Sequence, residues 1–206
     1  MKLAAASKMV FLHTFFWIVL FGGITYRFRE AIKRMLSGTK YFCRTNFALI
    51  AIFLALIEEA VAVAMNSLAD DFGAPAGQYL TITNSYLDLV LFHSAIVFVP
   101  MFITWAWLYL RYDFTPEQAF LLFGISGFIA EIIINPSWFT ALLTGGFWIF
   151  TYGIMIYTPA YAFGHQRKSC IKARWYHKAM AVALPLVSAV PVAFIISTVH
   201  PVTGFH

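Results

Sequence analysis

The sequence predicts an all-α, polytopic integral membrane protein of about six transmembrane helices in one bundle, with both termini on the non-cytoplasmic side. Three observations support this prediction. The 206 residues are 61% hydrophobic and only 11% charged, whereas an ordinary soluble domain carries roughly 25% charged residues. Apolar stretches of about 20 residues, long enough to cross a bilayer, recur along the chain. The basic residues gather between these stretches. We therefore expect a single membrane domain over residues 1–206.

The apolar stretches define the predicted spans. They cover residues 8–26, 47–66, 86–110, 119–135, 140–163 and 179–199. The first span is predicted to be a retained helix and not a cleaved signal peptide, because no small-residue cleavage site follows it. The basic residue Arg27 comes directly after this span, as expected where a helix ends in the cytoplasm.

Prolines and glycines predict irregular geometry in several spans. Pro100 lies within the third span, and Pro185 and Pro191 lie within the sixth. Each proline removes a backbone hydrogen bond and can kink its helix. Gly124 and Gly127, in the fourth span, are expected to let a neighbouring helix approach closely.

The distribution of Lys and Arg predicts the orientation. All but two of these 14 residues lie in the loops after the first, third and fifth spans, and the two exceptions are Lys2 and Lys8. Because loops rich in Lys and Arg remain in the cytoplasm, these three loops are predicted to be cytoplasmic. The same placement explains the net charge of +5 without a nucleic-acid partner. We expect a multi-pass protein of a cytoplasmic (plasma) membrane, with the lipid bilayer as its surroundings.

Ionisable side chains inside the predicted spans are the candidate catalytic residues. A charge at mid-bilayer costs about 2.5 kcal/mol or more, so such groups usually face a protein interior or a water-filled cavity. Three consecutive spans place such groups roughly 6 to 10 Å below their outer ends. Asp88 is shallower and is explained equally well as a helix cap. Ranked by the strength of the functional argument, the candidates are Glu131, Glu59, Glu58, His93 and Asp88.

Amide and aromatic side chains near the same depth are candidate substrate-binding residues. Aromatic side chains there could line a pocket for a lipid-like molecule, although an interfacial belt or core packing is their commoner role. The candidates are Asn66, Asn135, Trp138, Trp148 and Tyr152.

Three chemical roles fit the candidate acids. Clustered carboxylates can exchange protons as general acids or proton carriers, with His93 as a base or relay. Alternatively, Glu59, His93 and Glu131 could bind a divalent metal such as Zn, Mn or Fe. The metal is not favoured, because there is no HExxH motif and His93 is the only histidine assigned to the outer half of a span. Thirdly, the acids could attract a cationic cargo alongside aromatic side chains.

A short motif suggests a class of substrate. The string Ile57-Glu58-Glu59-Ala60 resembles the paired glutamates of two membrane enzyme families that act on isoprenoid-bearing substrates, the CAAX-type intramembrane proteases and the lycopene cyclases. The resemblance implies chemistry on a lipid or isoprenoid. Val63 stands at the position of the protease family's arginine, and the proline that precedes the cyclase pair is absent. No catalytic residue is therefore carried over from either family.

The leading hypothesis is a membrane-embedded enzyme, an isomerase, cyclase or hydrolase, that performs acid-base chemistry on a lipid-like or isoprenoid substrate. Glu131 and either Glu58 or Glu59 are expected to donate and accept the proton, with His93 assisting. Two alternatives stay open: a small proton- or cation-coupled transporter or channel, and an accessory subunit of a membrane complex. The sequence indicates no particular cofactor or protein partner. The confinement of the acids to the outer half of the spans favours the enzyme over the transporter.

Overall fold

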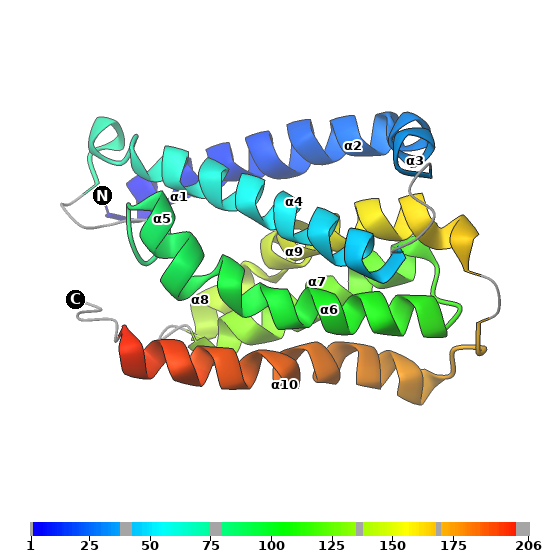
Figure 1. Cartoon of the computed structure of the whole chain (residues 1–206). Helices are drawn as coiled ribbons and strands as arrows, with labels where there is room; N and C mark the ends of the chain where they lie inside the picture. The colour runs from blue at the N-terminus through cyan, green and yellow to red at the C-terminus, as the bar shows by residue number, and fades with distance from the viewer. Residues whose placement is uncertain (1, 38–42, 75–79, 135–137, 168–169, 201–206) are drawn as a thin grey trace.

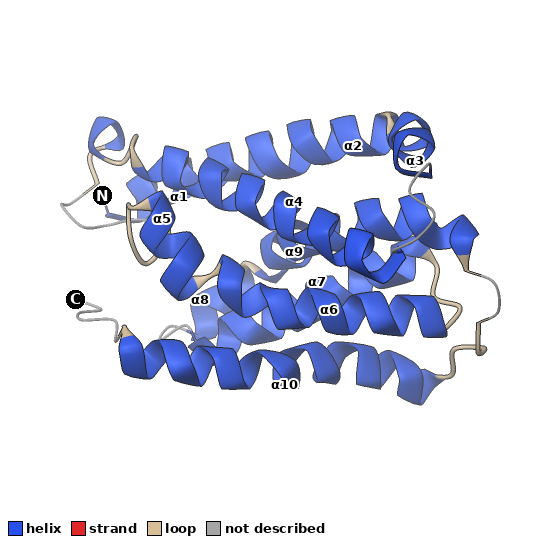
Figure 2. Cartoon of the chain, viewed as in Figure 1, coloured by secondary structure: helices blue, strands red, loops and turns tan. Residues whose placement is uncertain are grey.

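The computed structural model describes the chain in five stretches and is all-α. The described residues are 2–37, 43–74, 80–134, 138–167 and 170–200. Figure 1 shows long helices running side by side between two ends of the molecule, with α1 beginning at the same end at which α10 stops. Helices account for nearly all of the described chain (Figure 2).

The helices follow one another through short connections. In chain order they are α1 (Lys2–His13), α2 (Gly23–Arg27), α3 (Arg29–Ser37), α4 (Cys43–Asn66), α5 (Tyr86–Asp88), α6 (Ala95–Arg111), α7 (Pro116–Ile134), α8 (Trp138–Leu143), α9 (Gly145–Phe163) and α10 (Trp175–Val199). A π-helical segment, Thr14–Gly22, joins α1 to α2, and a second, Leu89–His93, continues α5. Short 3-10 turns cover Asp70–Phe72 and Gly164–Gln166.

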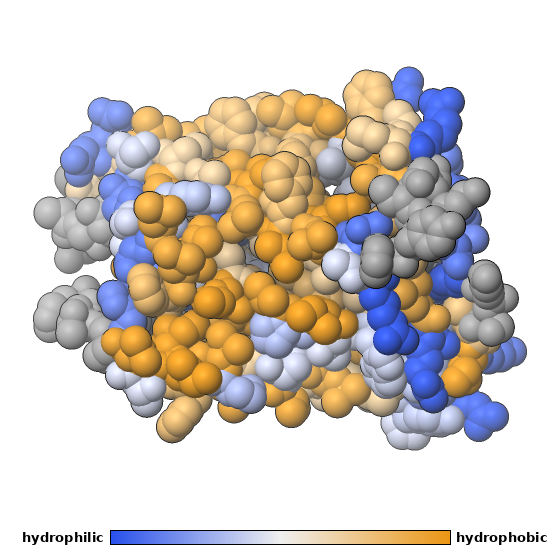
Figure 3. All heavy atoms as spheres, in the orientation of Figure 1, coloured by the Kyte–Doolittle hydropathy of each residue, from blue (hydrophilic) through white to orange (hydrophobic). Residues whose placement is uncertain are grey.

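Within the described residues, four helical stretches are long and apolar enough to cross a bilayer, and a bent pair of helices makes a fifth. The four are Ser7–Arg27, Cys43–Asn66, Pro116–Ile134 and Trp175–Val199, and the pair is Tyr86–His93 with Ala95–Arg111. Figure 3 shows an apolar band around the middle of the molecule, with hydrophilic side chains at both ends. The prediction of a multi-pass helical membrane protein is confirmed at this level.

The predicted span 140–163 is divided in the structure. α8 and α9 separate at Thr144, and α9 is not among the helices that pass the length and hydropathy criteria. Most residues of α9 from Thr151 to Phe163 are buried by neighbouring helices. A helix covered by its neighbours can carry polar residues such as Thr158 that a lipid-facing helix avoids. The structure thus supports four or five spans, where the sequence predicted about six.

The third membrane pass, made of Tyr86–His93 and Ala95–Arg111, bends at Ser94. The axes of the helices before and after this residue differ by 50°. Ser94 has φ −121° and ψ −77°, outside the helical region. Its N–H donates to the carbonyl of Leu89 at 2.8 Å, the spacing of a π-helical turn. The bend therefore arises from a change in the backbone hydrogen-bond pattern. The positions of the prolines do not predict it.

Glycines allow α7 and α9 to pack closely, as the sequence predicts. A Cβ at Gly124 would collide with the backbone oxygen of Ile149, and a Cβ at Gly127 would collide with the ring of Tyr152. Small residues at such crossings are a common means of packing membrane helices. The close approach fixes the position of Tyr152 over α7.

The two ends of the bundle differ in charge. The end that holds α3, called the α3 end below, carries Arg29, Lys33 and Arg34 on α3 itself, and Figure 3 shows strongly hydrophilic side chains there. The opposite end, called the α5 end, carries Asp70 and Asp71 in the turn after α4. The assignment of the α3 end to the cytoplasm remains a prediction from these charges.

Candidate functional site

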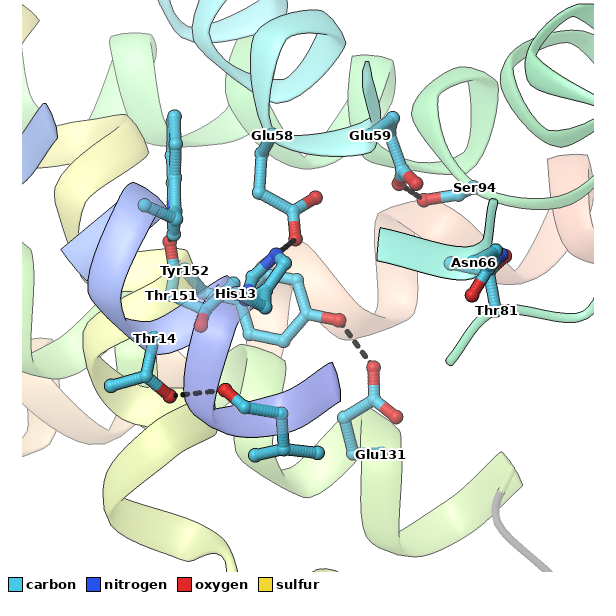
Figure 4. A network of polar contacts seen from close by, with 12 residues as sticks. His13, Thr14, Glu58, Glu59, Asn66, Thr81, Ser94, Glu131, Thr151 and Tyr152 are labelled. Carbon is cyan, nitrogen blue, oxygen red and sulfur yellow. Dashed lines mark hydrogen bonds and ion pairs between the residues drawn. The ribbon is translucent and has the colours of Figure 1, made fainter. Parts of the chain in front are cut away.

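Three glutamates from two helices lie close together on the α5 side of the bundle. α4 contributes Glu58 and Glu59, and α7 contributes Glu131 (Figure 4). Glu58 and Glu59 are buried, and Glu131 is half-buried and interacts electrostatically with both. Glu58 and Glu59 are adjacent and point in different directions, yet both can be buried because α4 packs against α6 as well as α9. These three residues form what we call the acid cluster.

A buried histidine pairs with the first of these acids. Nε2 of His13, the last residue of α1, lies 2.9 Å from Oε1 of Glu58, and the histidine is only 1% exposed. Phe147 makes an edge contact with its ring at a centroid distance of 5.3 Å. When Glu58 is ionised it accepts the Nε2–H bond, which leaves Nδ1 of the neutral ring as an acceptor.

The second acid is bonded to the residue at the bend of the third pass. The hydroxyl of Ser94 donates a hydrogen bond to Oε1 of Glu59. This contact links α4 to the break between Leu89–His93 and α6. The sequence analysis assigned Ser94 no role, because neither its spacing nor its neighbours predict a break in the helix there.

The third acid is bonded to a tyrosine of α9. The hydroxyl of Tyr152 donates to Oε1 of Glu131, and the tyrosine side chain is buried. Its ring lies against Gly127, one turn before Glu131 on α7. The absence of a side chain at Gly127 therefore leaves room for the ring beside α7, with its hydroxyl at the carboxylate. Tyr152, a predicted substrate-binding residue, is thus in direct contact with the acid cluster.

Two buried polar atoms in the same region lack a partner among the described residues. They are Nδ1 of His13 and Oγ1 of Thr151. The backbone oxygen of Thr151, by contrast, accepts a hydrogen bond from Nε1 of Trp17 at 3.1 Å. Figure 4 shows His13 and Thr151 together on one side of the acid cluster. Since buried polar atoms in folded proteins are usually hydrogen-bonded, these two atoms mark a place for a water or a ligand group.

His93 and Asp88 lie in a second polar group, apart from the acid cluster. Nε2 of His93 is 3.3 Å from Oδ2 of Asp88, and Nε2 of His200 is 3.0 Å from Oδ1 of the same aspartate. The metal set suggested by the sequence combined His93 with Glu59 and Glu131. Among the described residues, the histidine and carboxylate atoms with metal-binding spacing are instead those of Asp88, His93 and His200. The helical break explains the difference, because it directs Ser94, and not His93, to the acids.

The remaining substrate-binding candidates have other surroundings. The amide of Asn66 is engaged by the loop after α4: it donates to Oγ1 of Thr81 and accepts from the N–H of Leu80, both at 2.6 Å. Trp148 donates to Oγ1 of Thr144 at 3.0 Å and stacks on the ring of Tyr152. Asn135 and the side chain of Trp138 lie outside the described residues.

Sequence reasoning missed two histidines that the structure places at these sites. His13 lies in the first predicted span, about 8 Å from its start by helical rise, so the statement that His93 is the only histidine of an outer half was wrong. The signal was available, because an imidazole within an apolar stretch is as unusual as a carboxylate there. His200 lies one residue beyond the last predicted span, and no pattern in the sequence relates it to Asp88.

Comparison with known proteins gives no further guide to the role of these sites. No family model, curated protein or solved structure matches the chain. The acid cluster and the Asp88, His93 and His200 group of this multi-pass helical membrane protein are therefore interpreted from their geometry.

Proposed function

We propose that the protein is a membrane-embedded enzyme in which the acid cluster, with His13 and Tyr152, transfers protons to and from an apolar, lipid-like substrate. The observation that carries this proposal is the buried pair of His13 and Glu58 beside Glu131. One nitrogen of the histidine is held by a carboxylate, and the other is buried and has no partner among the residues that the structure describes. This arrangement is typical of a general base whose tautomer is fixed by an acid.

His13 is the proposed base. Glu58 holds Nε2–H, so the lone pair of Nδ1 is free to take a proton from a substrate carbon or hydroxyl. Phe147 packs against the edge of the ring and restricts its rotation. The hydroxyl of Thr151, which has no partner within the described part of the chain, is proposed to bind a polar group of the substrate.

Glu131 is the proposed acid. A protonated carboxyl group donates its hydrogen to the substrate, and the Tyr152 hydroxyl stabilises the carboxylate that forms. Glu59 accepts a hydrogen bond from Ser94 and is given no direct part in the transfer.

The chemistry that fits such a pair is an isomerisation or a cyclisation. One proton is added to a carbon of a double bond by Glu131, a C–H bond at another carbon is broken by His13, and its electron pair forms the new double bond. The reaction is balanced without an external oxidant, reductant or water. A hydrolase would need a route for water to the buried cluster. Of the isomerase, the cyclase and the hydrolase, we therefore favour the first two.

An apolar groove on α4 supports access for a lipid-like molecule. The groove is a shallow, open depression of about 450 Å³. It includes Ile57 and Ala60, the residues on either side of the glutamate pair. Tyr86 closes one side, held by a hydrogen bond from its hydroxyl to the Leu56 carbonyl at 3.1 Å. A hydrocarbon chain in this groove would lie along the helix that carries Glu58 and Glu59.

Solvent deuterium incorporation tests the proposal. The purified protein in nanodiscs is incubated in deuterated buffer with an extract of membrane lipids and with a defined isoprenoid alcohol, and the lipids are analysed by mass spectrometry. Proton transfer is expected to place deuterium on carbon, and Glu131→Gln and His13→Gln are expected to abolish the label. Asp71→Asn, in the turn after α4, is the control and is expected to retain it.

The same variants separate the other candidate functions. If wild type gives no label but proteoliposomes show a proton or cation flux that Glu131→Gln abolishes, the protein is a transporter and the enzyme proposal is wrong. If neither activity is found and Glu131→Gln lowers only thermal stability, the cluster is structural. Retention of the wild-type melting temperature by the inactive variant supports the enzyme.

A further inference from the structure

Two histidines and an aspartate at the α5 end form a group outside the proposed acid-base machinery. Asp88 ends α5, His93 ends the π-helical segment Leu89–His93, and His200 follows α10. The group therefore joins the start of the third pass to the end of the last helix. One ligand atom from each residue lies within 4.8 Å of the other two.

We infer that Asp88, His93 and His200 bind a divalent first-row transition metal, with Zn²⁺ as the reference ion. Imidazole nitrogen and carboxylate oxygen are the ligand types that Zn²⁺, Fe²⁺ and Co²⁺ share. The site goes beyond the proposed function, since it uses none of the residues assigned to proton transfer.

The donor atoms lie close to the spacing of a tetrahedral site, although the two histidines contact different oxygens of Asp88. With metal–nitrogen and metal–oxygen bonds of about 2.0 to 2.1 Å, neighbouring ligand atoms of a tetrahedron are about 3.3 to 3.4 Å apart. The His93–Asp88 separation is 3.3 Å and the His200–Asp88 separation is 3.0 Å. Both nearest atoms of the histidines are Nε2, and the two contacts use different oxygens of the carboxylate. Small side-chain rotations would bring the three atoms onto one ion.

The surroundings orient the ligands. The ring of His200 stacks on Phe92 at a centroid distance of 4.6 Å, and the two histidine rings are 5.3 Å apart. His93 is nearly enclosed, with a side-chain exposure of 5%, while Asp88 and His200 are 28% and 43% exposed. A metal here would have one side covered by protein and the other open to solvent. Three protein ligands with an open fourth position is the arrangement of catalytic rather than closed structural zinc sites.

Metal titration tests this inference. The full-length protein in nanodiscs is stripped with a chelator, dialysed, and titrated with Zn²⁺ by calorimetry, and Co²⁺ is added in parallel to record its d–d absorption. We expect saturation at one ion per chain, and Co²⁺ bands of tetrahedral intensity. His200→Gln and Asp88→Asn are expected to weaken binding by about 100-fold or more, since even the loss of an outer-sphere partner costs roughly 10- to 100-fold.

Matched variants distinguish this site from adventitious binding. His165→Gln removes an exposed histidine at the other end of the molecule and is expected to leave the affinity unchanged. His200→Gln changes a residue after the last helix, so it tests the site even if His93→Gln fails to fold. Absence of saturable binding, or equal affinity of wild type and His200→Gln, would overturn the inference and leave an Asp–His ion-pair group. Neither outcome bears on deuterium transfer at the acid cluster.

Discussion

Tyr152 lies directly against Gly127, so the contact between these two residues places the tyrosine hydroxyl at Glu131. The ring occupies the space where any other residue at position 127 would carry its Cβ. The sequence of α7 therefore positions a side chain that belongs to α9. The first prediction tests this relationship.

Gly127→Ala is expected to destabilise the protein by about 1 to 3 kcal/mol, the usual cost of overpacking a core. The added methyl group must displace the ring of Tyr152 or separate α7 from α9. SDS-induced unfolding of the purified protein measures the change. Gly146→Ala is the control, because a Cβ there meets nothing within 4 Å. Equal stability of Gly127→Ala and Gly146→Ala would show that the contact is not tight.

Tyr152→Phe is expected to keep the packing and lose the hydrogen bond to Glu131. The free energy of unfolding should fall by about 1 to 3 kcal/mol, because a buried carboxyl group is left without its donor. Deuterium transfer to the substrate should slow while binding of the lipid is retained. Tyr176→Phe, at an exposed tyrosine, supplies the comparison. Unchanged transfer in Tyr152→Phe would remove the tyrosine from the proposed acid.

A double-mutant cycle on His13 and Glu58 is expected to give a coupling free energy of about 0.5 to 3 kcal/mol. The pair is buried and in direct contact at 2.9 Å, so each single alanine variant leaves the other polar group unsatisfied. The measurement compares the unfolding free energies of wild type, both single variants and the double variant. Additive effects would mean that the contact does not form in the membrane.

Glu30 is expected to make stability sensitive to acid. The hydrogen bond from Tyr161, followed by burial acting in the opposite sense and by Lys33, lowers the pKa of Glu30 below its ordinary value of 4.5. A lowered folded-state pKa gives stability that is complete above the ordinary value and is lost as the pH falls through the lowered pKa. Melting temperatures of wild type and Glu30→Gln should therefore differ near neutral pH and converge in acid. A constant difference across this range would assign the effect to packing.

The charge difference between the two ends predicts which of them faces the cytoplasm. Single cysteines are introduced at Asp71 and Lys172, both exposed, in a background with the native cysteines replaced by serine. A membrane-impermeant thiol reagent is expected to label position 71 on intact cells and position 172 only after permeabilisation. The reverse pattern would invert the predicted orientation.

The sequence predicts the helical class because an apolar stretch and its basic flank are local properties. It also places Glu59 and Glu131 at comparable depth, since helical rise converts residue number into height. It does not predict which residues meet. Glu58 meets His13 and Glu131 meets Tyr152 because of how separate helices are arranged about their axes, and no spacing within one helix carries that information.

The departures of the structure from the predictions have physical causes that patterns within one helix do not carry. His93 was assigned to the acids on the assumption of a continuous helix, and the π-type hydrogen bond of Ser94 rotates the chain at that point. The number of spans differs because interior packing, which is a property of the whole bundle, lets α9 carry threonine and tyrosine. The hydropathy of the α9 sequence does not reveal that neighbouring helices cover this helix.

The break at Ser94 has a mechanical consequence. His93 and Ser94 are adjacent in the chain, yet one contacts Asp88 and the other contacts Glu59. The acid cluster and the Asp88–His93 pair are thus connected through the helical break at Ser94, and the angle of this break depends on the backbone angles of Ser94. A change in these backbone angles is therefore expected to shift both the Asp88–His93 contact and the Ser94–Glu59 contact.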